Sequence, residues 1–414
     1  MASGFCLRIF AYVPFLLARF CTITIPAEVP KIEESLFNLT LNLQEARSPS
    51  PAGDATENLL LSPLGFSLVL GQIAAGANPV LREAIGGLLG WNEDTDDLTN
   101  IHTYHENILR NYSAGDEESS LQININSALF HRDFIEIRQN FQELVEESYA
   151  TELIPLAENA TENEHQQTVN NWVKNVTKDI IQTFPISAKT ISLFANVVYF
   201  NAEWEEPFSD QLTRPGKFFP TADKTTNATY LQGQQEIPYM ENKELDFKMI
   251  RMPYKSSKFN MSMYILAPQK HNLQEIIQNL TLSKFLEYRD QMSVKTVNLK
   301  IPKVSLKSKI QLKGDLEREI KKSLNGSKTI SKTFDYFSLP NVSDDSKCSL
   351  SNVVQESTFN VYEKGTTFAA LTAGYINYDG TAKNCRVDKP YLSIIMDDSN
   401  NIMLFWARIY HPSV

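Results

Sequence analysis

The sequence has few cysteines, no long apolar run outside its first residues, and no excess of positive charge. Its four cysteines are too few for a disulfide scaffold, and no two stand at zinc-ligand spacing. Cys348 and Cys385 belong to the mature chain and either pair or stay free. No segment after the N-terminal region holds about 18 uninterrupted apolar residues, so no membrane span is expected. A net charge of −10 argues against nucleic acid and anionic membranes as partners, because both attract basic faces.

The short motifs of common enzyme classes are also missing. The chain has no G-x-S-x-G elbow, no H-E-x-x-H, no G-x-x-x-x-G-K-[ST] and no G-x-G-x-x-G. The six histidines show no ligand spacing, and His102 with His105 is interpreted as a polar helix face. Acidic residues are plentiful, but nothing points to a carboxylate pair for glycoside chemistry. The sequence therefore predicts a protein that is not an enzyme and that holds no metal or cofactor.

The first 27 residues are predicted to be a secretory signal peptide. Arg8 supplies the positive start, and Ile9 to Ala18 form an apolar run of ten residues, too short to span a bilayer. Pro14 and Arg19 fit this pattern poorly, so a ragged N-terminal strand is the alternative.

Nine N-x-[ST] sequons favour a secreted, extracellular glycoprotein, since chance alone gives roughly five. The candidate glycosylation sites are Asn38, Asn111, Asn159, Asn175, Asn227, Asn260, Asn279, Asn325 and Asn341.

The remaining chain has the composition of a large globular core, with 42% hydrophobic residues. Helical patterns come early: Ser62 can cap a helix that Pro63 begins, and its side chains are apolar nearly all round. Strand patterns come late, although Ile191 to Phe200 already has the β-rich apolar run of a central strand. Residues 397–401 have the composition of a hairpin turn. The order predicts an α+β fold with large antiparallel or mixed sheets, in one domain over residues 28–414.

Six blocks, in order over residues 32–412, resemble those of the serpin family. They are Ser62-Pro63-Leu-Gly-Phe-Ser67, Asn170-Asn171-Trp172-Val173 with Thr177, Asn196-Val-Val-Tyr-Phe200 with Trp204 and Phe208, Tyr362-Glu363-Lys364-Gly365-Thr366, Asp388-Lys389-Pro390-Tyr391 and Leu404-Phe405-Trp406-Ala407-Arg408. The resemblance implies a serpin-like α+β fold of three β-sheets and about nine helices. It also implies an exposed reactive-centre loop at about residues 363–386, where no helix or strand pattern is convincing and a solvated linker is the alternative.

The resemblance further implies a suicide-substrate mechanism. An extracellular serine endopeptidase, or a cysteine endopeptidase, cleaves the loop of a monomeric inhibitor, and the freed hinge inserts into the large sheet before the acyl-enzyme is hydrolysed. Family loop length places the cleaved bond at Asp379–Gly380, with Tyr378 as the alternative if the register slips by one. An Asp there would exclude trypsin-like enzymes, whose pocket carboxylate repels it.

Hinge residues must enter a packed sheet, and two of them are large. The implied hinge comprises Gly365, Thr366, Thr367, Phe368, Ala369, Ala370, Leu371 and Thr372. Phe368 and Leu371 depart from the small side chains of the family, and overpacking a filled site costs roughly 1–3 kcal/mol. The alternative is therefore a non-inhibitory serpin, an extracellular carrier or binding protein whose loop is cleaved without trapping. A third possibility is a secreted hydrolase on another fold.

A second group of residues is implied to govern opening of the sheet. Its members are Ser62, Ser67, Asn196, Trp204 and Gln355. Gln355 stands where many family members have a His, and Gly65 also replaces a usual family residue.

Overall fold

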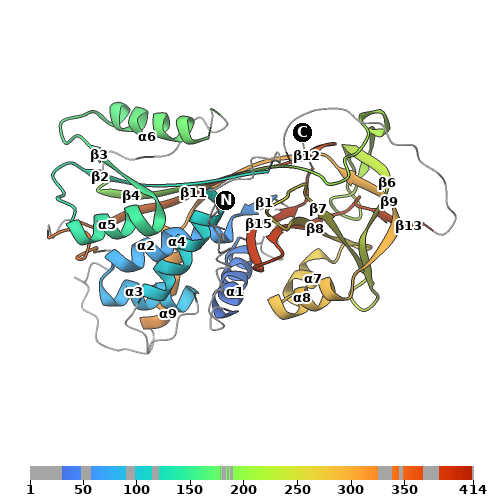
Figure 1. Ribbon diagram of the computed structural model, residues 1–414, viewed down its shortest axis with the longest axis horizontal. Helices are drawn as coiled ribbons and strands as arrows, with labels where there is room; N and C mark the ends of the chain where they lie inside the picture. The colour runs from blue at the N-terminus through green and yellow to red at the C-terminus, as the bar shows by residue number, and fades with distance from the viewer. Residues whose placement is uncertain are drawn as a thin grey trace, which may run out of the picture.

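The computed structural model describes residues 30–47, 57–89, 98–113, 121–177, 179, 183, 186, 190–324, 338–344, 348–366 and 382–412 (Figure 1). The predicted signal peptide (1–27), Asn325 and most of the predicted reactive loop lie outside the described residues. That part of the loop includes Thr367 to Thr372, Tyr378, Asp379 and Gly380.

One sheet has six strands, and its two central long strands run parallel to each other. The strand order is β10 (Val304–Gln311), β11 (Leu350–Val361), β4 (Ser192–Glu203), β2 (Gln122–Arg132) and β3 (Thr151–Leu156), with the short β12 (Gly365–Thr366) paired to β4. Strands β4 and β11 pair in parallel while both pair antiparallel to their outer neighbours. The predicted strand at residues 191–200 is confirmed, because β4 is buried along nearly its whole length.

The other sheet has nine strands, eight of them in one hydrogen-bonded path. The order is β1 (Leu59–Leu61), β15 (Ile402–Ile409), β14 (Tyr391–Asp397), β8 (Met261–Pro268), β7 (Phe247–Pro253), β6 (Thr226–Asn242), β9 (Ser293–Pro302) and β13 (Lys383–Arg386), with β5 (Arg214–Phe218) also on β6. Strand β6 pairs with β9 through Tyr239 and with β7 from Tyr239 onward. The resemblance implied three sheets; here β6 joins two of them, so the described strands form two hydrogen-bonded sheets.

The described residues contain nine α-helices and one short 3-10 helix. They are α1 (Pro30–Ala46), α2 (Pro63–Gly76), α3 (Pro79–Leu89), α4 (Thr99–Ser113), α5 (Gln139–Tyr149), α6 (Glu162–Val176), α7 (Leu273–Gln278), α8 (Leu282–Asp290), α9 (Lys313–Leu324) and η1 (Asp210–Leu212). Helix α6 covers one face of the six-stranded sheet, and α2 to α5 lie below the other face (Figure 1). The α+β class is confirmed.

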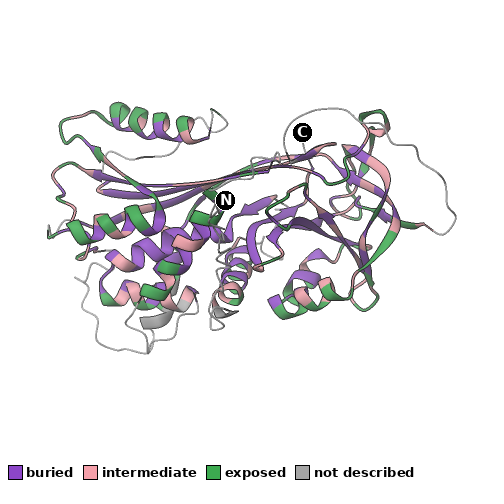
Figure 2. Ribbon diagram, viewed as in Figure 1, coloured by how far each residue is buried: buried purple, intermediate pink, exposed green. Residues whose placement is uncertain are grey.

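Helix α2 is the central helix of the core, and its sequence explains why. The Ser62 hydroxyl accepts a hydrogen bond from the Gly65 backbone at 3.3 Å, and Pro63 occupies the first turn, where no amide hydrogen is needed. Every described side chain of α2 except Ala75 is buried, as its all-round apolar pattern predicts (Figure 2).

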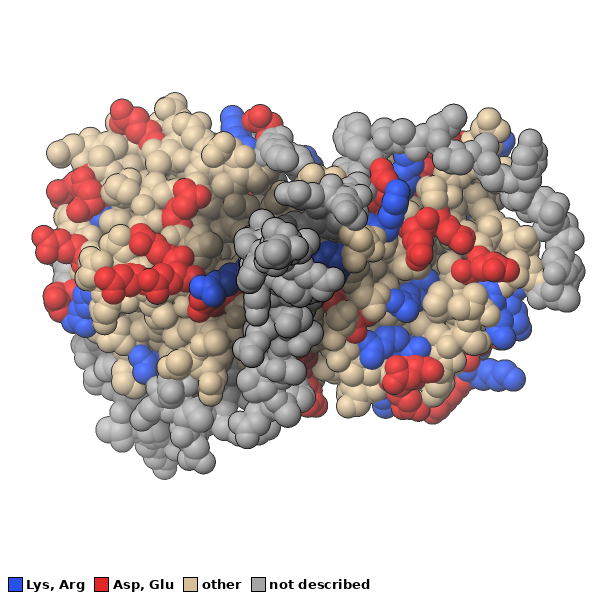
Figure 3. All heavy atoms as spheres, viewed as in Figure 1, with Lys and Arg blue, Asp and Glu red and all other residues tan. Residues whose placement is uncertain are grey.

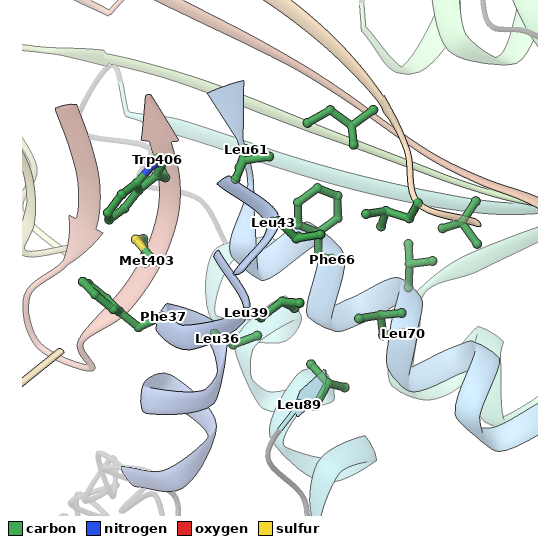
Figure 4. Close-up of a cluster of buried hydrophobic side chains, with 14 of the residues drawn as sticks. Leu36, Phe37, Leu39, Leu43, Leu61, Phe66, Leu70, Leu89, Met403 and Trp406 are labelled. Carbon is green, nitrogen blue, oxygen red and sulfur yellow. The ribbon is translucent and has the colours of Figure 1, made fainter. Parts of the chain in front are cut away.

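The core joins the first helix to the end of the chain. Phe37 of α1 packs edge-on against Trp406 of β15, with ring centroids 5.7 Å apart (Figure 4). The Trp406 indole donates to Gln44 Oε1 at 2.8 Å. The predicted hairpin turn at residues 397–401 is confirmed by the antiparallel pair β14–β15.

Cys348 and Cys385 do not form a disulfide with each other. Both are buried, and burial raises the pKa of the Cys385 thiol to about 12. The interpretation of His102 and His105 as a polar helix face is wrong, since both are buried against Tyr149 of α5.

Of the helices that the structure describes, none has the length and apolar character needed to cross a membrane.

Candidate functional site

The chain reverses direction just after β11 and re-enters the six-stranded sheet. Tyr362 and Gly365 exchange backbone hydrogen bonds at 2.8 and 3.3 Å, which closes a tight turn. Gly365 and Thr366 then pair antiparallel with Glu203 and Ala202 of β4. The last pair between β11 and β4 is Thr358 with Tyr199, so β12 occupies the open top of the β4–β11 seam.

Trp204 holds this turn through both its backbone and its ring. Its indole donates to Tyr362 O at 2.9 Å, and its backbone amide donates to Lys364 O at 2.7 Å. The ring is 2% exposed and stacks on Tyr254 at 4.6 Å between centroids. The resemblance implied that Trp204 governs opening of the sheet; in the structure Trp204 contacts the turn between β11 and β12.

The carboxylate of Glu363 is the charged anchor of the turn. It lies 3.0 Å from the Lys303 ammonium of the β9–β10 junction and accepts a 2.7 Å hydrogen bond from the Thr213 hydroxyl. Burial acts to raise the pKa of Glu363, but the bonds from Thr213 and Lys303 outweigh it, and the net pKa lies below its ordinary value. The group therefore stays ionised and keeps β12 tied to the rest of the molecule.

Gly365 is required by close approach of two backbones. A Cβ at this position would overlap the carbonyl oxygen of Ala202 and lie 2.6 Å from the Cα of Glu203. Backbone atoms of a central strand cannot move aside, so only glycine admits the observed pairing.

Two amide side chains face each other across the middle of the seam, and each is tied to its own side. Gln355 of β11 accepts from Ser62 N and donates to Ser62 O, both at 2.9 Å. Asn196 of β4, the register partner of Gln355, donates to Ser127 Oγ of β2 at 3.1 Å. The Asn196 side-chain oxygen is buried and has no hydrogen-bond partner in the part of the chain that the structure describes.

Gly65 of α2 explains how this arrangement fits. A Cβ there would overlap both the Asn196 oxygen and the Gln355 nitrogen, and would lie 2.8 Å from Val198 Cγ2. The two departures from the family pattern, Gly65 and Gln355, are therefore one feature: the missing side chain makes room for the amide. The sequence shows both departures, and their joint occurrence is the signal of their coupling; the packing of α2 against the seam gives its physical reason.

The seam also carries buried polar atoms that have no hydrogen-bond partner among the described residues. Five buried side-chain oxygens without a hydrogen-bond partner lie on β4 and β11, on Asn196, Asn201, Glu356, Ser357 and Thr358. An unsatisfied buried polar group costs about 1–3 kcal/mol. Burial raises the pKa of Glu356 to about 7 despite the Lys309 ammonium 3.7 Å away. Burial of these polar side chains lowers the stability of the sheet at the seam.

The five predicted sheet-opening residues do not form one cluster. Ser62, Asn196 and Gln355 meet under the seam, and Trp204 lies at the hinge. Ser67 lies on another side of α2, where its hydroxyl is 2.6 Å from His105 Nε2 in a buried group with Tyr149.

The predicted sequons are mostly accessible. Asn38, Asn111, Asn159, Asn175, Asn227, Asn260 and Asn279 are exposed. Asn341 is half-buried, and its amide nitrogen, the atom that glycosylation modifies, donates to Ala75 O at 3.3 Å.

Comparison with known proteins identifies this architecture. The family description "Serpin (serine protease inhibitor)" matches residues 38–412, and the chain belongs to that family. Serpin A3-5 of Bos taurus is 26% identical over 363 residues, which cover 86% of this chain and 84% of the bovine protein. A serine protease inhibitor of Cyanea capillata is 24% identical over 367 residues, covering 87% of this chain and 93% of that one.

Solved structures show the same fold. Human thyroxine-binding globulin superposes with a TM-score of 0.82 at 18% identity, covering 94% of this chain and all of that one. Human glycosylated kallistatin superposes with a TM-score of 0.78 at 22% identity, covering 93% of this chain and 98% of that one.

Proposed function

We propose that the protein is a secreted, extracellular inhibitor of serine endopeptidases, and of some cysteine endopeptidases, that acts by insertion of its cleaved loop. Residues 1–27 would be removed on secretion. The bond that the protease cleaves would be Asp379–Gly380, or the bond after Tyr378. The observation that carries the proposal is the pairing of Gly365 and Thr366 with β4, because the first two residues of the hinge already occupy the seam.

The register of β12 can be extended along β4. Strand β4 has 12 residues, so the same antiparallel register would set residues 365–376 opposite Glu203 to Ser192. Asp379, which precedes the proposed cleaved bond, would then lie three residues beyond the end of the inserted segment at residue 376. The unpartnered Asn196 oxygen would face Thr372, whose hydroxyl is a hydrogen-bond donor.

Insertion would replace one strand pairing by two. The eight register pairs that join β11 to β4 would separate, and the new strand would pair with both. At about 1 kcal/mol for each net hydrogen bond, one additional ladder of roughly ten bonds contributes about 10 kcal/mol. Overpacking by the two large residues, at roughly 1–3 kcal/mol each, costs less than this gain.

The large hinge residues favour a second function. In the extended register Phe368 would face Phe200, which is buried, and Leu371 would face the buried Val197. A barrier of about 1.4 kcal/mol at this step slows insertion tenfold, and hydrolysis of the acyl-enzyme would then come first. The protein would then be a non-inhibitory extracellular carrier, as the name thyroxine-binding globulin indicates for one of the similar structures.

A panel of serine and cysteine endopeptidases separates the two functions. An inhibitor forms a complex with its protease that survives SDS, whereas a carrier is cleaved within residues 367–381 and releases the enzyme. Thr366→Arg would place a charge opposite Ala202, which is fully buried, and is expected to convert an inhibitor into a substrate. Thr367→Arg, which would face the half-exposed Asn201, is the matched control and is expected to retain the complex. Equal loss of the complex in both variants would refute the proposed register.

A further inference from the structure

Asn341 lies in a short segment, residues 338–344, that closes the C-terminal end of helix α2. Its backbone amide donates to Gly76 O at 3.2 Å, and its side-chain amide donates to Ala75 O at 3.3 Å and to Ala77 O at 3.5 Å. The last carbonyl groups of a helix have no partner within the helix, so a side chain that supplies donors to them acts as a cap. Asn341 therefore serves three consecutive carbonyl oxygens at the end of α2.

The two residues after Asn341 complete an N-x-[ST] sequon, and both are held in the core. Val342 is fully buried, and a Cβ on Gly76 would overlap its Cγ2, so the segment and the helix are in close contact. The carbonyl of Val342 accepts from the backbone amide of Arg138, which precedes α5, at 2.8 Å. Ser343, the hydroxyl residue of the sequon, is 2% exposed. The Asn341 side chain therefore cannot turn to solvent unless the whole segment leaves α2.

The segment also connects α2 to the strand that follows. Leu339 N donates to Cys348 O at 2.9 Å, just before β11 begins. At the other end of the helix, Gln355 of β11 bonds to both backbone groups of Ser62 at 2.9 Å. Helix α2 is thus held at one end by β11 and at the other end by the segment that leads into β11.

A glycan on Asn341 is incompatible with this arrangement. Transfer of an oligosaccharide from its lipid pyrophosphate donor joins the sugar C1 to Nδ2, while Nδ2 gives up one proton and the lipid pyrophosphate leaves. Nδ2 then keeps one hydrogen instead of two, so at least one of its bonds to the Ala75 and Ala77 carbonyls is lost. The first sugar ring, attached directly to Nδ2, would also have to lie where the end of α2 packs. Asn159, at an exposed turn, has no such neighbours.

We propose that Asn341 is the C-terminal cap of α2 and not a glycan site, and that glycosylation of Asn341 and native folding exclude each other. A chain that is modified here would fail to seat α2 against the segment and would not reach the native state. Glycans on the exposed sequons would not interfere. The proposal rests on the proposed function only in that the chain is secreted, and the cap itself does not depend on secretion.

The cap is tested in the chain produced without glycans in bacteria. Asn341→Asp is isosteric, removes both side-chain donors, and sets a carboxylate against carbonyl oxygens at the negative end of the helix dipole. Asn159→Asp is the matched control. Both variants add one negative charge to the half of the molecule that holds α2 and α6 in Figure 1, where Asp and Glu predominate on the face shown in Figure 3. A general effect of charge would therefore be the same in both.

We expect Asn341→Asp to lower the Tm by about 3–4 °C, because two hydrogen bonds are lost and an unfavourable charge is added, and Asn159→Asp to melt at the wild-type temperature. Equal melting temperatures of the two variants and the wild type would overturn the cap.

Exclusion of the glycan is tested in the full-length chain expressed in eukaryotic cells. Release of N-glycans by a peptide-N-glycosidase in heavy-oxygen water converts each modified Asn into a labelled Asp, and peptide mass spectrometry then gives the occupancy of each sequon in the secreted protein. We expect label at the exposed sequons and none at Asn341. A glycan on Asn341 in secreted protein that melts as the wild type does would overturn the proposal. Absence of secretion, or of label at every exposed sequon, would instead overturn the proposed secretion and leave the cap to the first test.

Discussion

Gly65→Ala is the sharpest perturbation of the seam. The added Cβ would overlap the facing ends of the Asn196 and Gln355 side chains, both of which are buried. Gln355 can avoid the overlap only by leaving Ser62, whose backbone N–H and C=O it satisfies. A single methyl group on α2 therefore disconnects the helix from β11.

The expected cost follows from these contacts. Two hydrogen bonds contribute about 1 kcal/mol each, and residual overpacking adds roughly 1 kcal/mol or more. Unfolding entropy of about 2.1 cal/mol/K per residue then converts a loss of about 3 kcal/mol into a Tm lower by about 3–4 °C. Differential scanning calorimetry of the intact, uncleaved protein measures this shift.

Gly314→Ala is the matched control. Gly314 lies in α9, and a Cβ there would meet no atom within 4 Å. Removal of a helical glycine stabilises by up to about 1 kcal/mol, so this variant is expected to melt at the wild-type temperature or slightly above. If the Tm of Gly65→Ala equalled those of Gly314→Ala and the wild type, the inferred coupling of Gly65 to Gln355 would be wrong.

Three further predictions concern the hinge and the seam. Gly365→Ala should expel β12, because its Cβ would overlap Ala202 O, and amide exchange over residues 199–206 should rise at least tenfold. Lys303→Met should lower the Tm at pH 7. Because the folded pKa of Glu363 is lowered, the stability it contributes is present above its ordinary pKa of 4.5, and the difference between variant and wild type should vanish as the pH falls through the lowered value. Glu356→Gln should remove a pH dependence of stability that has the opposite sign. Because the folded pKa of Glu356 is raised to about 7, the wild type should lose stability as the pH rises from 4.5 through 7.

The first two variants have matched controls, and the third is tested by its own pH profile. Gly233→Ala, whose Cβ would lie 3.4 Å from Phe208 in ordinary contact, should leave exchange at residues 199–206 unchanged. Lys284→Met, on the exposed side of α8, should not alter the pH dependence of the Tm. A Glu356→Gln protein whose Tm still falls between pH 5 and 8 as the wild type does would show that another group titrates in that range.

Local sequence signals predicted the elements that depend on local chemistry. Ser62 and Pro63 define the start of α2, and the apolar β-rich run at residues 191–200 defines β4 because both of its faces are covered. The turn at residues 397–401 is likewise encoded by its own residues. The family motifs then supplied the hinge and the order of the blocks.

Features that depend on partners distant in the sequence could not be predicted from local patterns. The burial of His105 depends on Tyr149, a residue of another helix, and the room for Gln355 depends on Gly65, which lies 290 positions earlier in the chain. The division into sheets depends on where β6 changes its partner at Tyr239, which no local pattern marks. The pairing of Gly365 with Glu203 is set by the strand register and by the contacts of Trp204, so the motif alone could not reveal it.

The melting temperature of the protein after cleavage of its loop tests the central claim most directly. If residues 366–376 complete the strand that Gly365 begins, the added ladder of about 10 kcal/mol corresponds to a rise in Tm of more than about 10 °C over the intact protein. A cleaved protein that melts at or below the temperature of the intact one would contradict insertion at the β4–β11 seam.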